Sequence, residues 1–324
     1  MTARALRLLR VGRTVADLSR ASAFYHDVLG FTVGNVAEAD PAWAELLGGA
    51  GARVLTCRLR LGQQELELAE FDPPGAPYPS DSTAADLWFQ HIAIVTPDMD
   101  AAYRRLAARG VAPITRGGPQ HLPPSTGGVM AFKFRDPDGH PLELIQFPPG
   151  TGDPVWQEPA SGALTIGFDH SALSIADAAR SIGFYTGVLD FALASQQVNR
   201  GPEQDCLDGL GGVAVDVVAL RPMRGQTPHV ELLGYRRPRG RAASATPRPS
   251  DIAADRLIVE VEGLAAILEA LRAPASGIVT LADGAQAALV RDPDGHSVVL
   301  EAALGNDTEG RRSTESTESE RTPV

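Results

Sequence analysis

Two sequence segments occur twice in this chain. Residues 23–31 read AFYHDVLGF and residues 183–191 read GFYTGVLDF, while RDPDGHPLEL at 135–144 recurs as RDPDGHSVVL at 291–300. The copies lie roughly 160 residues apart in both cases, which indicates two modules of similar length in tandem. We therefore expect each module to fold into the same kind of unit, with the differences in length placed in loops.

Composition predicts where the modules begin and end. The segment 150–162 is rich in Pro and Gly and is predicted to link a first module, 1–149, to a second module, 163–304. Residues 305–324 are polar and low in complexity, so we expect a disordered tail there. The hydrophobic fraction of 44% is enough to build a core in the remaining chain.

Each module reads as a strand, a helix and further strands, followed by the same order again. In the first module, the segment 18–30 is predicted to be a helix that Asp17 caps and Gly30 ends. A second helix is predicted at 99–110, with strands of alternating apolar residues around it. The DPDGH motif is predicted to be a tight hairpin turn that His140 helps to shape.

The charge balance and the cysteine count narrow the classes of function. Lys and Arg number 29 and Asp and Glu number 40, which gives a net charge of −11, so we expect no nucleic-acid partner. Two cysteines do not make a disulfide framework. No segment approaches the roughly 18 apolar residues of a membrane span, and the basic N-terminus lacks the apolar run of a signal peptide. These features predict a cytoplasmic protein with no membrane partner.

The repeated motifs resemble those of the vicinal oxygen chelate superfamily, which includes glyoxalase I, ring-cleaving extradiol dioxygenases, methylmalonyl-CoA epimerase and antibiotic-resistance proteins. The resemblance covers about residues 6–147 and 164–303. It implies an α+β fold of two tandem modules, each of paired βαβββ units that form curved mixed sheets with helices on the outside. It implies much less about the reaction, because one fold supports many chemistries.

Members of this superfamily place metal ligands at four strand positions in each module. In the first module, the matching positions hold Arg10, Glu67, His91 and Glu143. In the second module, they hold His170, Glu231, Arg256 and Val299. The His and Glu side chains can bind a metal ion, whereas arginine is cationic and valine has no lone pair.

The pairing of half-modules decides whether a complete site exists. In glyoxalase-like members, the first half of one module faces the second half of the other, which groups His91 and Glu143 with His170 and Glu231. The other site then contains the valine, both arginines and Glu67, and we expect both arginines to pair with Glu67. If the halves pair within each module instead, neither site is complete. In the cross-module arrangement, all three positions without a metal-binding side chain (Arg10, Arg256 and Val299) fall in one site and leave the other complete. This grouping favours the cross-module arrangement.

The predicted set suits one divalent metal ion, namely Zn, Ni, Co, Mn or Fe(II). Isolated His and Glu side chains in apolar strands must face a cavity or be paired. The simpler alternative for His91 alone is a buried histidine with ordinary hydrogen bonds, and for Glu143 alone an edge position. Their coincidence with two further ligand-type residues favours the metal site.

Three further residues are candidates for contacts near this site: His229, Asn199 and His121. His229 lies two residues before Glu231 and so shares its face, where it either supports the ligands, shuttles a proton or packs at the rim. Asn199 belongs to a polar stretch with Arg200 and Gln204 that is a candidate for substrate contact. The loop 117–128 is rich in Pro and Gly, and it either closes over the site or is solvated.

Three functions are compatible with these residues. The first is a lyase or isomerase of glyoxalase or epimerase type, in which Glu143 or Glu231 takes a proton next to a carbonyl and an enediolate-type intermediate forms. The second is a non-haem iron, ring-cleaving dioxygenase, although such two-module relatives keep their ligands in the second module, where Arg256 and Val299 stand. The third is a metal-free ligand-binding or resistance protein. All three imply a small-molecule ligand and a monomer or homodimer.

Overall fold

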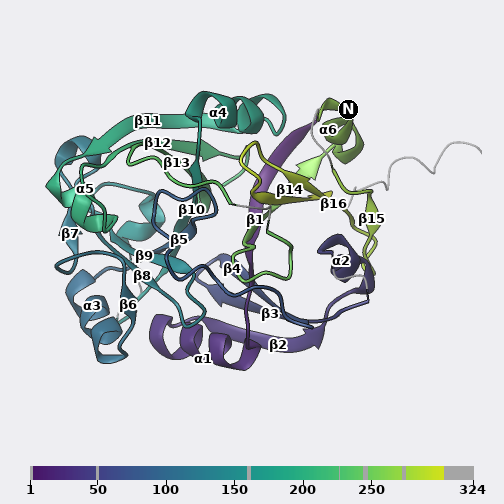
Figure 1. The fold of residues 1–324 in the computed structure, drawn as a ribbon, viewed down its shortest axis with the longest axis horizontal. Coiled ribbons are helices and arrows are strands. Elements are labelled where there is room, and N and C mark those ends of the chain that lie inside the picture. The colour runs from purple at the N-terminus through teal and green to yellow at the C-terminus, as the bar shows by residue number, and fades with distance from the viewer. Residues whose placement is uncertain are drawn as a thin grey trace, which may run out of the picture.

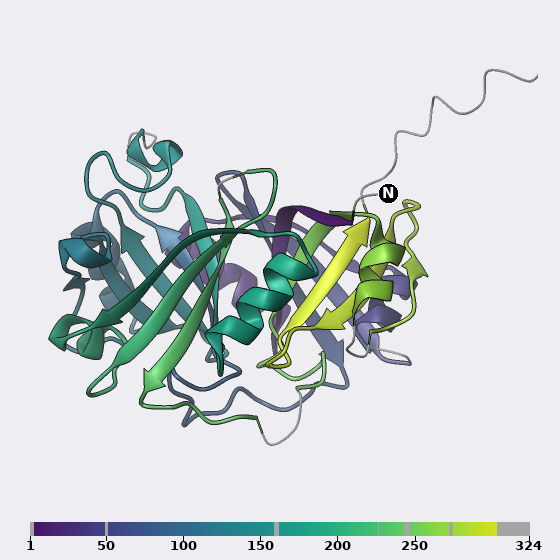
Figure 2. The same cartoon turned by 90° about the horizontal axis from the view of Figure 1, so that it is seen from above.

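The computed structural model describes residues 3–48, 51–158, 162–225, 227–243, 247–271 and 275–302. Its strands form two large sheets that lie beside each other, with the longer helices on the outside (Figures 1 and 2). The predicted disordered tail at 305–324 lies outside the described residues.

The order of elements repeats between the two modules. The first module contains β1 (Arg4–Thr14), α1 (Leu18–Leu29), β2 (Thr32–Glu38), α2 (Pro41–Leu46), β3 (Arg53–Leu61), β4 (Gln64–Asp72), β5 (Gln90–Val95), α3 (Met99–Ala108), β6 (Ala112–Pro113), β7 (Gln120–His121), the 3₁₀ turn η1 (Pro124–Thr126), β8 (Met130–Arg135) and β9 (Pro141–Gln146). After the 3₁₀ turn η2 (Pro154–Gln157), the second contains β10 (Gly167–Ile175), α4 (Ala178–Gly187), β11 (Ala192–Arg200), α5 (Pro202–Leu207), β12 (Ala214–Arg221), β13 (His229–Arg237), β14 (Arg256–Glu262), α6 (Leu264–Ala270), β15 (Val279–Thr280), β16 (Gln286–Arg291) and β17 (Ser297–Ala302).

Each sheet is built from halves of both modules. The eight-stranded sheet has the order β15-β16-β17-β14-β1-β4-β3-β2, and the nine-stranded sheet has the order β11-β12-β13-β10-β5-β9-β8-β6 with β7 beside β8. The modules meet where β1 pairs with β14 and where β10 pairs with β5, antiparallel in both cases. This topology confirms the mixed α+β fold and places the second half of the first module with the first half of the second.

The repeated helices begin and end as their sequences predict. The side chain of Asp17 accepts a hydrogen bond from the backbone N–H of Arg20 at the start of α1, and Asp177 accepts one from Arg180 at the start of α4. Gly30 ends α1 with φ of 75°, a conformation that glycine adopts without strain. The predicted cap and stop of the first helix are thus confirmed.

The main hydrophobic core joins the two modules. It lies between the sheets and the outer helices, and its buried members include Tyr25 of α1 and, from both sheets, Leu59, Ile92, Leu173 and Leu257. Smaller clusters of apolar residues lie elsewhere on the sheets. No helix in the described ranges is long and apolar enough to cross a bilayer.

One edge strand of each sheet and the short helix that follows it are not predicted by the sequence pattern. β2 and β11 occupy equivalent edge positions, and α2 and α5 follow them. Most residues of both strands are exposed. An edge strand with water on both sides has no apolar alternation for a sequence pattern to detect. The polar stretch around Asn199 thus lies at the end of β11 and in α5.

Candidate metal centre

The four predicted ligands lie on four adjacent strands, β13, β10, β5 and β9, which carry Glu231, His170, His91 and Glu143 respectively. Ala93 is opposite both His170 and Glu143, and Ala172 is opposite both His91 and Glu231. Residues two apart in a strand face the same side, so all four side chains point to one face of the sheet. Because the side chains of Ala93 and Ala172 are small, they leave space between the four ligand side chains.

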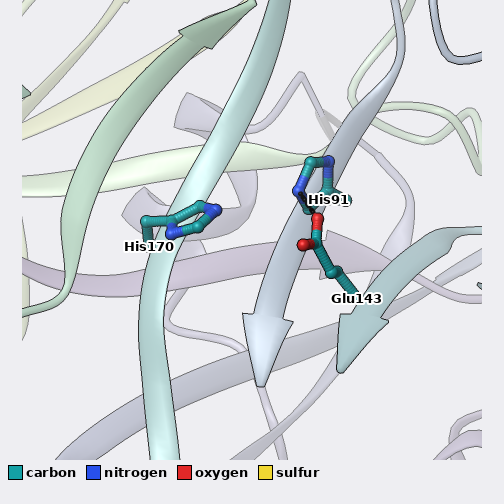
Figure 3. Close-up of side chains that lie close together, drawn as sticks. All are labelled: His91, Glu143 and His170. Carbon is teal, nitrogen blue, oxygen red and sulfur yellow. Dashed lines mark ion pairs between the residues drawn. The ribbon is translucent and has the colours of Figure 1, made fainter. Parts of the chain in front are cut away.

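Three of these side chains converge closely. Ligand atoms of His91, Glu143 and His170 lie within 4.8 Å of one another (Figure 3). Nε2 of His91 is 2.9 Å from a carboxylate oxygen of Glu143. Glu231 is outside this tight group, but its carboxylate lies 3.5 Å from Nε2 of His170. The structure thus brings the four residues together, with Glu231 at the side of the cluster.

The imidazole of His91 has the properties of a metal ligand. It is buried, and neither ring nitrogen forms a hydrogen bond of good geometry within the described part of the chain. Burial lowers its pKa to about 4 against the opposing effect of Glu143, so the ring is neutral at pH 7. Buried polar atoms without a partner are uncommon. The nitrogen and oxygen atoms gathered here fit a divalent ion, which could bind Nε2 of His91 together with the nearby Glu143 carboxylate.

His170 is oriented by Asp169, which the sequence analysis did not single out. Nδ1 of His170 lies 3.0 Å from Oδ2 of Asp169, and Nε1 of Trp156 donates to the same carboxylate at 2.8 Å. Successive strand residues ordinarily face opposite sides. The register of β10 against β5 shifts between Phe168 and His170, and such an irregularity re-aims a side chain. With Nδ1 bonded to a carboxylate, Nε2 is left to face a metal ion.

A buried ion pair, also missed from the sequence, supports Glu143. Lys133 on β8 is opposite Glu143, and its Nζ lies 3.8 Å from the Glu143 carboxylate and 2.7 Å from that of Asp208. Burial alone raises the carboxyl pKa of Glu143, but the Lys133 charge and His91 outweigh it and hold the pKa at about 2. Glu143 is therefore anionic at neutral pH. The available signal was a single charged residue in the apolar strand sequence MAFKF.

A cavity of about 360 Å³ lies against this cluster. Asn199 and His229, two of the three residues predicted to make contacts near the site, are among its lining residues. Leu122 and Thr126 of the 117–128 loop also line it, so that loop forms part of the wall. His121 is exposed and is not among the lining residues, so the structure does not bring it to the cavity.

The equivalent site in the eight-stranded sheet is filled by protein side chains. Nε of Arg10 donates to Glu67 at 3.1 Å, and Nε1 of Trp43 donates to the other Glu67 oxygen at 3.1 Å. The predicted pairing of Arg256 with Glu67 is wrong, because Arg256 instead donates to Thr14 Oγ1 at 3.1 Å. Arg256 lies on the strand beside β1, where it reaches Thr14 near the end of β1. Burial lowers its pKa.

Asp169→Asn is expected to weaken metal binding by roughly 10- to 100-fold without changing the stoichiometry, because the amide orients His170 less strongly than the carboxylate does. Titration of the metal-free protein with Zn²⁺ against a competing chelator measures the effect. Asp190→Asn, in the turn between α4 and β11 and not among the residues that line the cavity, is the control. An affinity equal to that of the unaltered protein would show that Asp169 does not support a ligand.

Comparison with known proteins agrees with this geometry at the level of family and fold. The model of the glyoxalase/bleomycin resistance protein/dioxygenase superfamily matches residues 7–144 and 167–300. "Virulence protein STM3117" of Salmonella typhimurium is 33% identical over 135 residues, which is 41% of this chain and 79% of that protein.

Solved structures share the two-module fold. Glyoxalase I from Zea mays superposes with a TM-score of 0.59 at 18% identity, over 91% of this chain and 92% of that chain. A putative dioxygenase from Bacillus subtilis gives a TM-score of 0.57 at 13% identity, over 94% of this chain and 87% of that chain. At such identities the likeness concerns the fold alone. Both matched segments together span most of the sequence, and the chain belongs to the glyoxalase/bleomycin resistance protein/dioxygenase superfamily.

Proposed function

We propose that this protein is a metal-dependent lyase or isomerase of glyoxalase or epimerase type, acting on a small substrate with adjacent oxygens. The observation that carries the proposal is the convergence of His91, Glu143 and His170, with Glu231 beside them, against one cavity. A divalent ion held by these residues would supply Lewis-acid polarisation of substrate oxygens. One chain provides all four residues, so a monomer and a homodimer are both compatible with the proposal.

Glu231 is the better placed of the two carboxylates to act as the base. Its side chain is 19% exposed, against 8% for Glu143. Glu143 is held between His91 and Lys133, whereas the one ion-pair partner of Glu231 in the described structure is His170. A carboxylate with few partners at the open side of the cluster is free to take a proton from carbon and return it.

The charge balance of the cavity suits such a proton transfer. When Glu231 accepts a proton it loses its negative charge, while the substrate oxygens gain one. The net charge of the cavity therefore does not change, and no uncompensated buried charge is created. Lys133 and Asp208 neutralise each other at 2.7 Å and add no net charge. Asp169 keeps His170 in place throughout.

Two measurements on the purified full chain test the reaction class. The first is metal content after reconstitution; a protein that retains no Zn²⁺, Ni²⁺, Co²⁺, Mn²⁺ or Fe²⁺ would favour a metal-free binding protein and sink the proposal. The second compares deuterium incorporation from D₂O into hydroxyacetone, dihydroxyacetone and the methylglyoxal–glutathione hemithioacetal with oxygen uptake on catechol. We expect metal-dependent exchange into one of these carbonyl compounds. Oxygen uptake without exchange would favour the ring-cleaving dioxygenase.

Glu231→Gln is expected to lower the rate of α-proton exchange by roughly 100- to 10,000-fold while one metal ion per chain is retained, because glutamine cannot accept the proton. Exchange followed by NMR at saturating metal measures the change. Glu269→Gln, on the exposed face of α6, is the control with a matched substitution. If Glu143→Gln slows exchange by this factor while keeping the metal and Glu231→Gln does not, Glu143 is the base instead.

A further inference from the structure

The cavity extends from Glu143, His170 and Glu231 of the candidate metal centre to the edge strand β11. Ala219 on β12 is opposite Glu231 on one side and Ser195 on the other. Ser195 and Glu231 are thus separated by two strand spacings, about 10 Å. The small Ala219 side chain forms the floor between them, and all three residues line the cavity. A small molecule held beside Glu231 can therefore also contact side chains of β11 across the cavity.

The far wall carries side chains that form hydrogen bonds. Ser195, Gln197 and Asn199 alternate along β11, share one face and line the cavity. Asn199 is 7% exposed, and its Oδ1 has no hydrogen-bond partner among the described residues. A buried carbonyl oxygen without a protein partner can accept a hydrogen bond from a ligand hydroxyl or from water.

Gln204 on α5 presents a second acceptor of the same kind. It is 5% exposed, and its Nε2 donates to Oδ2 of Asp208 at 2.8 Å. The other Asp208 oxygen accepts from Lys133 at 2.7 Å. An ionised carboxylate only accepts hydrogen bonds, so this chain of contacts fixes the Gln204 amide with its nitrogen toward Asp208. Oε1 of Gln204 is left without a partner within the described chain, while the residue lines the cavity.

The cationic side chains of the cavity are poorly placed to bind an acidic group. Lys133 is buried but already paired with Asp208. Arg221 lines the cavity but is exposed, where water weakens an ion pair. Asp153 and Asp169 add negative charge to the lining. The wall opposite the metal cluster therefore offers neutral amide and hydroxyl groups rather than a buried free cation.

We propose that this wall, formed by Ser195, Gln197, Asn199 and Gln204, recognises hydroxyl groups, and that the substrate is a small, uncharged, polyhydroxylated carbonyl compound. Its two adjacent oxygens face the metal cluster, and its remote hydroxyls donate to Asn199 and Gln204. Lys133 and Asp208 are positioning residues that set the orientation of the Gln204 amide. The inference rests on the proposed function, because it assumes that the adjacent oxygens are held at the cluster.

Calorimetric titration of the Co²⁺-loaded full chain with matched ketones tests the proposal. 2-Keto-myo-inositol and 2-hydroxycyclohexanone share a six-membered ring and adjacent oxygens, and the second lacks the remote hydroxyls. We expect the first to bind about 10- to 100-fold more tightly, as two hydrogen bonds would give. The double variant Asn199→Leu with Gln204→Met should remove this difference. Gln196→Leu, on the other face of β11, should keep it.

Each remaining outcome counts against one specific claim. Equal binding of the two ketones, or no binding of either by Co²⁺-loaded protein, overturns the hydroxyl-recognition wall and leaves the metal centre intact. Tighter binding of 2-ketogluconate that disappears in Arg221→Ala overturns it in favour of an acidic substrate. A protein that binds no Co²⁺ overturns the proposed function first. The comparison of ketones uses the unaltered protein, so it stands even if the double variant does not fold.

Discussion

Replacing either His91 or His170 with alanine is expected to abolish binding of one and the same divalent ion. The residues belong to different modules, yet β5 and β10 pair directly and bring their ligand atoms within 4.8 Å of each other and of Glu143. Partners that only orient a ligand contribute roughly 10- to 100-fold to metal affinity, so loss of a ligand itself should cost at least about 1,000-fold. Metal content after dialysis, and the visible spectrum of the Co²⁺ form, measure the loss.

The control for this experiment is His121→Ala, which removes an exposed histidine that the structure does not bring to the cavity. It should retain one metal ion per chain with an unchanged Co²⁺ spectrum. If His91→Ala and His170→Ala each kept a metal ion with a different spectrum, the two histidines would belong to separate sites and the cross-module centre would be wrong.

The predictability of this site from sequence depended on the pairing of half-modules. The residue types at the four positions were readable, but only the contact between β5 and β10 decides that His91 meets His170 rather than Glu67. Nothing local in either strand encodes that contact, since it forms between segments about 80 residues apart. The family resemblance supplied the arrangement, and the sheet topology confirms it.

The residues around the four ligands could not be predicted from the sequence, for local physical reasons. Strict alternation places Asp169 on the face opposite His170, and the register shift of β10 reverses that expectation. Lys133 reads as an isolated charge in an apolar strand until α5 brings Asp208 to 2.7 Å from it. The edge strand β11 lacks the apolar pattern that reveals a strand, so the polar wall of the cavity was visible only as a polar stretch around Asn199.

The eight-stranded sheet depends on a different buried charge cluster, centred on Arg13. Arg13 is fully buried and donates to both oxygens of Asp255, at 3.1 and 2.6 Å, and to the hydroxyl of Tyr25 at 2.8 Å. Tyr25 in turn donates to Asp136 of the DPDGH turn at 2.9 Å, where His140 also contacts Asp136. This agrees with the structural role expected for His140. The cluster connects β1, α1, one hairpin turn and the segment before β14, and so joins both modules.

Arg13→Met is expected to lower the free energy of unfolding by about 3–5 kcal/mol, because it removes the bidentate partner of the buried Asp255 carboxylate and leaves it the longer contact of 3.8 Å with Nε2 of His140. Asp136 keeps its contacts with Tyr25 and His140 and so loses less. Denaturant unfolding of the metal-free protein measures the change without a contribution from the metal centre. Arg20→Met removes an exposed partner of Asp138 and should cost less than about 1 kcal/mol.

The double variant Arg13→Met with Asp255→Leu separates two contributions to the free energy of unfolding. One is the net stabilisation by the ion pair, and the other is the cost of leaving one buried charge without its partner. Replacing both charges by apolar groups of similar size is often nearly neutral, so the double variant should recover most of the lost stability. The second module supports this expectation, since Leu173 holds the position equivalent to Arg13 and is fully buried there. A double variant as unstable as Arg13→Met alone would mean that Arg13 acts through Tyr25 and Asp136 instead of through Asp255.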